Sequence, residues 1–118
     1  MANIQAAAYE RLAWQPGFIP FRFNCGPIRG SAHAQAVTWG RERKHAGVSD
    51  LAVLVAGRLM IWIEIKQPGE KHLDSQRLFA AEVEGQGGHV FTVRTLDELE
   101  AVIERIKSIR DRIDAQRG

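Results

Sequence analysis

Two acidic residues and a lysine lie where a pair of neighbouring strands would bring them together. Asp50 comes just before the apolar run 51–55, and Glu64 and Lys66 close the run 59–66. A three-residue turn at 56–58 would place Asp50 directly opposite Glu64. Two facing carboxylates repel each other unless a divalent cation lies between them, and Mg²⁺ or Mn²⁺ prefers such oxygen ligands. The pattern therefore predicts a metal site, with the Lys66 ammonium beside it to stabilise charge that develops on a phosphoryl group.

The alternation of the run 59–66 supports this grouping. Alternate residues of a strand point to opposite faces of a sheet, so Glu64 and Lys66 share one face. The opposite face is entirely aliphatic and is expected to belong to the core: Leu59, Ile61, Ile63 and Ile65. Gln76 follows in the first turn of the next helix, where it could reach back to the same site or simply be solvated. The simpler alternative is a structural Glu64–Lys66 pair, with Asp50 only beginning a strand.

The elements that would position these residues can be predicted from periodicity and from turn residues. Helices are expected at 4–14, at 73–84 and from Thr95 to about Ala115, and strands at 18–24, 49–55, 59–66 and 89–93. This order predicts an α/β fold, a four-stranded mixed sheet flanked by helices, as a single domain over residues 1–118. Pro20 favours either an edge position for the first strand or a strand that begins later in the chain.

Local signals refine the helices. Asp74 is a candidate cap for the second helix, and Thr95 with Glu98 has the spacing of a capping box. In the second helix, Leu78, Phe79 and Val83 are expected to share one apolar side. The last helix has an apolar stripe, which would dock on its own sheet or on a second copy of the chain: Leu99, Ile103, Ile106 and Ile113. We expect a homodimer from this stripe.

Composition excludes several classes of protein. The chain is 45% hydrophobic and 25% charged, which is ordinary for a globular domain, and its longest apolar runs are too short to span a bilayer. Cys25 is the only cysteine, and the first 20 residues do not resemble a secretory signal, so a cytoplasmic location in a bacterial or phage-infected cell is expected. No phosphate-binding loop motif occurs, so no nucleotide cofactor is expected.

The segment 25–46 lacks apolar periodicity and is expected to be a long loop. It ends in a basic cluster that could be an ordinary solvated loop or could bind nucleic acid: Arg41, Arg43 and Lys44. We assign Arg22 and Asn24, at the end of the first strand, to the same nucleic-acid-binding group.

Several segments together resemble the VRR-NUC domain, a branch of the PD-(D/E)XK nuclease superfamily. They are Gly47-Val48-Ser49-Asp50-Leu51, Trp62-Ile63-Glu64-Ile65-Lys66, Gln76, Gly87-Gly88-His89-Val90 and Arg94-Thr95-Leu96-Asp97-Glu98-Leu99. The resemblance implies an αβββαβ core in which Asp50, Glu64 and the main-chain carbonyl of Ile65 bind the metal. It also implies that Lys66 is the catalytic lysine and that Gln76 completes the site. Family members often have a glutamate in the first helix; Glu10 is the only acid there and is a possible additional ligand.

The expected function is therefore Mg²⁺- or Mn²⁺-dependent hydrolysis of phosphodiester bonds in DNA. By resemblance, branched DNA such as a four-way junction is the favoured substrate, and a two-fold dimer would present two metal sites to it. The alternative is a nucleic-acid-binding module on a nuclease fold, with weak or no catalysis.

Overall fold

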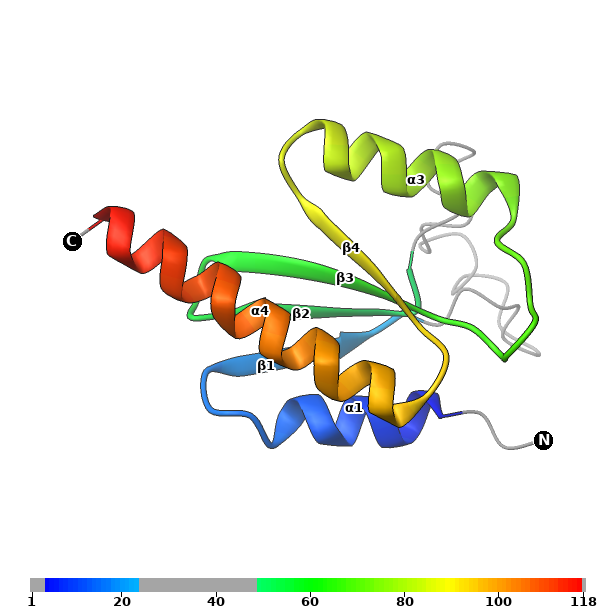
Figure 1. Cartoon of the computed structure of the whole chain (residues 1–118), viewed down its shortest axis with the longest axis horizontal. Helices are drawn as coiled ribbons and strands as arrows, with labels where there is room; N and C mark the ends of the chain where they lie inside the picture. Colours follow the sequence, from blue (N-terminus) through cyan, green and yellow to red (C-terminus); the bar gives the residue numbers. More distant parts are fainter. Residues whose placement is uncertain (1–3, 24–48, 118) are drawn as a thin grey trace, which may run out of the picture.

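The computed structural model describes residues 4–23 and 49–117, and it has the α/β fold that the sequence predicts (Figure 1). Its elements are α1 (Gln5–Ala13), β1 (Phe18–Arg22), β2 (Leu51–Val55), β3 (Leu59–Ile65), α3 (Asp74–Gly85), β4 (His89–Val93) and α4 (Leu96–Arg117). The predicted order of helices and strands is confirmed, and most boundaries shift by one or two residues. The clearest shift is in the second strand, which begins at Leu51, so that Asp50 lies just outside it.

The four strands form one mixed sheet in the order β1-β2-β3-β4. β1 and β3 both run antiparallel to β2, whereas β4, which follows the α3 crossover, runs parallel to β3. Of the two interpretations of Pro20, the edge position is the one observed, because within residues 4–23 and 49–117 β1 pairs only with β2. An edge strand tolerates proline because one side of it needs no ladder hydrogen bonds.

The hairpin register is also the predicted one. Val55 faces Leu59, and Leu51 faces Ile63 at the last pair of the ladder, so Asp50 and Glu64 occupy the next opposed positions. The chain reverses through Ala56 and Gly57, which have left-handed φ values of 55° and 72°. Glycine adopts this conformation without steric cost, whereas alanine does not.

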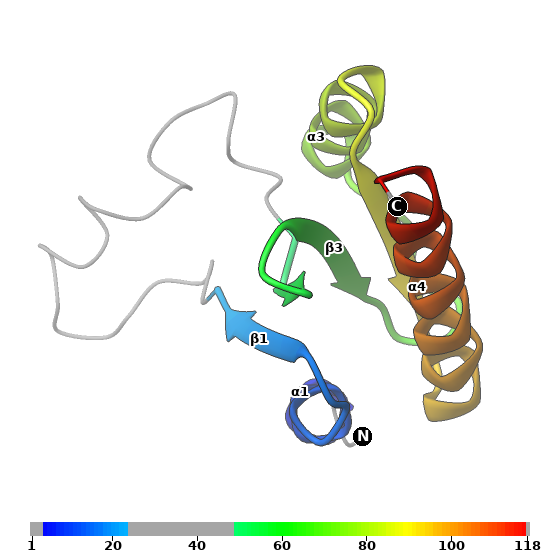
Figure 2. The same ribbon diagram turned by 90° about the vertical axis from the view of Figure 1, so that its left-hand side faces the viewer.

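The main core lies between one face of the sheet and the helices α1 and α4 (Figure 2). β2 and β3 contribute their fully buried odd-numbered residues to it, among them Val53, Ile61 and Ile63. The apolar stripe of α4 belongs to this core, since Leu99, Ile103 and Ile106 are buried, and Ile113 is half-buried. The stripe therefore packs within the monomer and no longer argues for a dimer, which stays an untested prediction.

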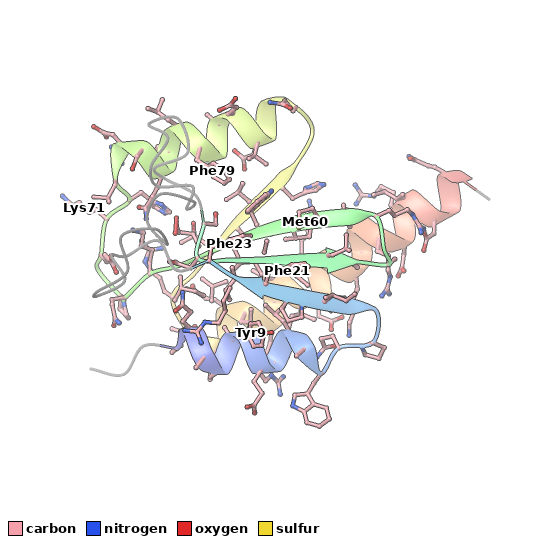
Figure 3. The ribbon with its side chains drawn as sticks, turned by 180° about the vertical axis from the view of Figure 1, so that it is seen from behind. Tyr9, Phe21, Phe23, Met60, Lys71 and Phe79 are labelled. Carbon is pink, nitrogen blue, oxygen red and sulfur yellow. The ribbon has the colours of Figure 1, made fainter. Side chains whose placement is uncertain are left out.

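The opposite face of the sheet is covered in part by α3. Trp62 stacks on Phe23, with ring centroids 5.8 Å apart, and meets the edge of Phe79 at 5.2 Å. Figure 3 shows Phe79 reaching from α3 towards Phe23. The prediction for Leu78 was wrong: its side chain is 71% exposed. Consecutive helical residues point about 100° apart, so the rotation that buries Phe79 turns Leu78 outwards.

The start of α3 also differs from the prediction. Leu73 occupies the N-cap position and Asp74 is the first helical residue. Gln76 takes over the capping, because its side-chain Oε1 accepts a hydrogen bond from the Leu73 N–H. At the start of α4 half of the predicted capping box is present: the hydroxyl of Thr95 accepts from the Glu98 N–H, whereas the Glu98 carboxylate accepts from the Arg94 N–H.

Pairing between β1 and β2 continues one step beyond the ladder. The Phe23 N–H donates to the Asp50 carbonyl at 2.9 Å. This bond fixes the backbone of Asp50 from the β1 side.

Across residues 4–23 and 49–117, no helix has the length and apolar character needed to cross a bilayer.

Candidate active site

Asp50 and Glu64 meet where β2 begins and β3 ends. The Asp50 side-chain Oδ2 accepts a hydrogen bond from the Ile65 N–H at 2.9 Å. This bond holds the Asp50 carboxylate against the end of β3, beside the Ile65 peptide. The predicted apposition of the two acids is thus present, and it depends on the register that the short hairpin turn sets.

The carboxyl group of Glu64 is buried and one of its oxygen atoms lacks a hydrogen bond within the described residues. Glu64 is only 3% exposed, and its Oε1 has no hydrogen-bond partner among the residues that the structure describes. Burial, followed by the charge and hydrogen bonding of Asp50, raises the pKa of Glu64 to about 8, and the nearby Lys66 only partly opposes this. At neutral pH and without a cation, Glu64 is therefore mainly protonated.

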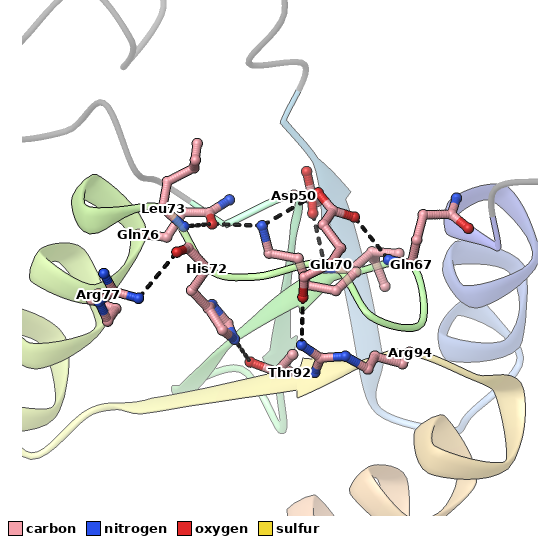
Figure 4. A network of polar contacts seen from close by, with 11 residues as sticks. Asp50, Gln67, Glu70, His72, Leu73, Gln76, Arg77, Thr92 and Arg94 are labelled. Carbon is pink, nitrogen blue, oxygen red and sulfur yellow. Dashed lines mark hydrogen bonds and ion pairs between the residues drawn. The ribbon is translucent and has the colours of Figure 1, made fainter.

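Lys66 lies two residues further along the same face and is also buried, with a side chain 3% exposed. Its Nζ donates to the Gln76 Oε1 at 2.6 Å and lies 3.6 Å from the Glu70 Oε2 (Figure 4). Because the same Gln76 oxygen accepts from the Leu73 N–H at 2.8 Å, the start of α3 fixes the position of the ammonium. The structure thus brings Gln76 to Lys66.

Glu70 is a member of the site that the sequence analysis missed. Its Oε1 accepts from the Gln67 N–H at 2.9 Å, which closes the turn after β3 and turns the carboxylate towards Lys66. This backbone hydrogen bond and the charge of Lys66 hold the pKa of Glu70 below its usual value. The spacing of four residues from Lys66, across Pro68 and Gly69, was the only available signal.

His72 and Thr92 continue the polar row across the sheet. Thr92 on β4 is the register partner of Glu64, and its Oγ1 lies 3.2 Å from the His72 Nε2. Burial, followed by the positive charges of Lys66, Arg94 and Arg77, lowers the pKa of His72. The Arg94 guanidinium is held by a 2.8 Å hydrogen bond that it donates to the Glu70 carbonyl.

A cavity of about 380 Å³ opens beside this row, between α3 and the sheet. Glu64, Thr92 and His72 line it together with Ser49. Ser49 is 1% exposed, and its hydroxyl has no hydrogen-bond partner within the described part of the chain. Buried polar groups normally have partners, so two orphaned oxygen atoms on one cavity indicate a place where a ligand would bind.

The residues fit a hard divalent cation, though with few ligands. No cluster of three or more His, Cys, Asp or Glu side chains with metal-binding geometry occurs among residues 4–23 and 49–117. Asp50 and Glu64 would supply two carboxylates, and the Ile65 carbonyl a third ligand. Mg²⁺ is commonly held by one or two carboxylates and keeps several waters. The unpartnered Oε1 and the raised pKa of Glu64 are what an acidic pair shows when its counter-charge is lacking.

The other predicted residues lie apart from this centre. Arg22 is exposed at the end of β1, and its guanidinium donates to the Gln5 side chain at 3.1 Å. Glu10 is exposed on α1, and no recorded contact between described residues joins it to Asp50 or Glu64. Asn24, Arg41, Arg43 and Lys44 fall outside the described residues.

Comparison of the chain with protein-family models, with curated proteins and with solved structures finds no match.

Proposed function

We propose that this chain is a metal-dependent DNA endonuclease of the VRR-NUC type, with its active site at Asp50, Glu64 and Lys66. The observation that supports this most is a buried glutamate, Glu64, that faces the half-buried Asp50 beside a buried lysine, Lys66. Burying such a group lowers the stability of the fold, because each buried charge loses its hydration. We infer that the group is kept for a function. Phosphodiester hydrolysis needs these parts: oxygen ligands for a cation and a fixed positive charge near phosphorus.

A Mg²⁺ or Mn²⁺ ion held by Asp50, Glu64 and the Ile65 carbonyl would supply Lewis acidity and a nucleophilic water. The protein's own contribution is positional. The Ile65 N–H fixes one oxygen of Asp50, so that the other can face the ion. Gln76 and Glu70 hold the Lys66 ammonium. From there Lys66 can donate to the non-bridging phosphoryl oxygen on which charge grows as water attacks phosphorus.

The substrate class is proposed from the resemblance and from the charge around the site. Arg77 and Arg94 flank it, and both suit phosphate because a guanidinium donates in pairs. Branched DNA, including four-way junctions, is the proposed substrate, and a homodimer would allow paired cuts. The alternative is a binding module on the same fold, which would bind DNA but not cut it.

The test is cleavage of a supercoiled plasmid and of a synthetic four-way junction with Mn²⁺ or Mg²⁺, with EDTA as the blank. The Asp50→Asn and Glu64→Gln proteins keep the size of each side chain and remove its negative charge. We expect cleavage by the wild type alone. Binding without cleavage by the wild type would favour the binding module, and equal cleavage by wild type and Asp50→Asn would refute the assigned site.

A further inference from the structure

The cavity beside Glu64 has two different ends. Towards the metal site it is lined by Ser49, Glu64 and Thr92, and Arg77 lies on its rim. Away from that site, α3 contributes Glu84, which follows Arg77 by two helical turns. The lining therefore changes along its length: the donors Ser49, Thr92 and Arg77 lie at the end that contains Glu64, and the far end carries a second acid, Glu84.

Ser49 is the donor through which this cavity could bind a ligand oxygen. Its hydroxyl is buried and has no partner within residues 4–23 and 49–117, yet it lines an open cavity. A buried hydroxyl without a partner loses the hydration it had in the unfolded chain. A ligand oxygen in the cavity would restore that lost hydrogen bond.

Arg77 can supply charge at the same end. Its guanidinium donates to the His72 carbonyl at 3.1 Å and pairs with Asp74, and the side chain is 62% exposed. Exposed ion pairs contribute little free energy, so this arginine can turn to a stronger acceptor at small cost. Arg77 also lines the same cavity as Ser49 and Glu64.

Between the two ends the walls carry small side chains. Ala80 and Ala81 on α3 face the cavity, with Val90 on the sheet. Alanine leaves room that a larger side chain would fill, and the mixed lining suits a sugar with one charged neighbour. The order of donors, small apolar residues and an acid thus matches one nucleotide lying along α3, with its phosphate towards Arg77.

We propose that this cavity binds one nucleotide of the cut strand, next to the scissile bond. Its phosphodiester accepts hydrogen bonds from the Ser49 hydroxyl and the Arg77 guanidinium. The proposal rests on the proposed function, because it takes the Asp50–Glu64 pair as the position of the scissile phosphate. It assigns substrate binding to Arg77, which lies outside the motif segments and the basic segment 41–44, and to Ser49, which lies in a motif segment but had no role assigned to it.

The test pairs a protein change with a substrate change. Oligonucleotide substrates carry one neutral methylphosphonate, either at the 5′ or at the 3′ neighbour of the cut. For one of the two, we expect the wild type to lose about tenfold in kcat/KM, the size of one charge-assisted hydrogen bond. Arg77→Gln should reduce kcat/KM about tenfold on the natural substrate. On the methylphosphonate substrate that the wild type cleaves poorly, the same substitution should cause no further loss. Ser49→Ala should show a smaller loss of the same kind.

Arg58→Gln is the matched control. Arg58 also forms an exposed ion pair, with Asp114, but it lies on the hairpin turn at the other end of β3. This variant should respond to methylphosphonate as the wild type does. If Arg77→Gln loses the full factor on both modified substrates, or if neither modification affects the wild type, the proposal is overturned.

Binding separates this proposal from the proposed function. The same comparison is made by fluorescence anisotropy, with Arg77→Gln added to the Asp50→Asn protein. If the wild type binds DNA without cutting it, the proposed endonuclease activity is refuted. The anisotropy measurements then test the proposed role of the cavity independently of cleavage. If the losses in affinity from Arg77→Gln and from the methylphosphonate are not additive, they support the cavity as the phosphodiester site. Additive losses overturn it.

Discussion

Replacing Glu64 by glutamine should stabilise the metal-free protein, and more so as the pH rises. The pKa of Glu64 is raised to about 8 from an ordinary value of 4.5, so the folded state binds this proton more tightly than the unfolded state does. Ionisation of Glu64 therefore opposes folding. Its effect is absent below pH 4.5, grows as the pH rises and becomes constant above about pH 8.

The size of the effect follows from the shift. One pKa unit corresponds to about 1.4 kcal/mol, so at pH 7 the penalty is at most about 3 kcal/mol. Domains of this size have roughly 5–15 kcal/mol of stability in total, so the change is easy to measure. Glutamine resembles the protonated acid in shape and cannot ionise, and therefore the Glu64→Gln protein should escape the penalty.

The assay is urea unfolding in EDTA, followed by tryptophan fluorescence, at pH 5, 7 and 8.5. Wild type and variant should agree within about 1 kcal/mol at pH 5, and the variant should be the more stable by up to about 5 kcal/mol at pH 8.5. The pKa of His72 is lowered, so below its ordinary value of 6.5 this residue makes the free energy of unfolding rise with pH. His72 is present in both proteins, and its effect cancels in the difference. A Glu82→Gln protein, changed at an exposed position of α3, is the control.

The reasoning fails if the difference between wild type and Glu64→Gln does not change with pH. A second arm adds Mn²⁺ at pH 7. Binding to the folded state alone should raise the stability of the wild type, since the cation supplies the counter-charge that Glu64 lacks, and should raise that of the variant much less.

Three further outcomes are expected. Lys66→Ala should lower kcat by orders of magnitude while DNA affinity stays within a few fold, because a transition-state contact acts on rate; equal losses in both would make Lys66 a binding residue. Gln76→Ala removes the acceptor that holds Lys66, so kcat should fall by about tenfold or more with KM nearly constant in steady-state cleavage. Ala56→Gly relieves a left-handed φ of 55°, and urea unfolding should show a gain of up to about 1 kcal/mol; a loss would mean that the methyl group matters more in packing.

The centre of the site could be predicted because it depends on local rules. Strands alternate with a period of two, and the short spacer between the apolar runs sets the register, so the apposition of Asp50 and Glu64 follows from counting. The Lys66 side chain shares the face of Glu64 for the same reason. No tertiary information was needed for these three residues.

The rest depends on segments without a period. Glu70 and His72 lie in the irregular connection between β3 and α3, and Ser49 lies just before β2, so their side-chain directions follow from the fold as a whole. The helix faces show the same limit. Periodicity defined an apolar side containing Leu78 but could not say how α3 is rotated on the sheet. It likewise could not tell whether the stripe of α4 meets its own sheet or a second copy.

The hydrogen bond from the Phe23 N–H to the Asp50 carbonyl has a consequence for chain length. It joins two residues that are 27 positions apart in sequence and so holds Phe23 and Asp50 side by side. Closing a flexible loop costs only about 0.6 kcal/mol more for each doubling of its length. Shortening or lengthening the segment between Phe23 and Asp50 should therefore change the loop-closure entropy only slightly. Variants of different length in this segment should therefore keep Asp50, Glu64 and Lys66 in the same positions.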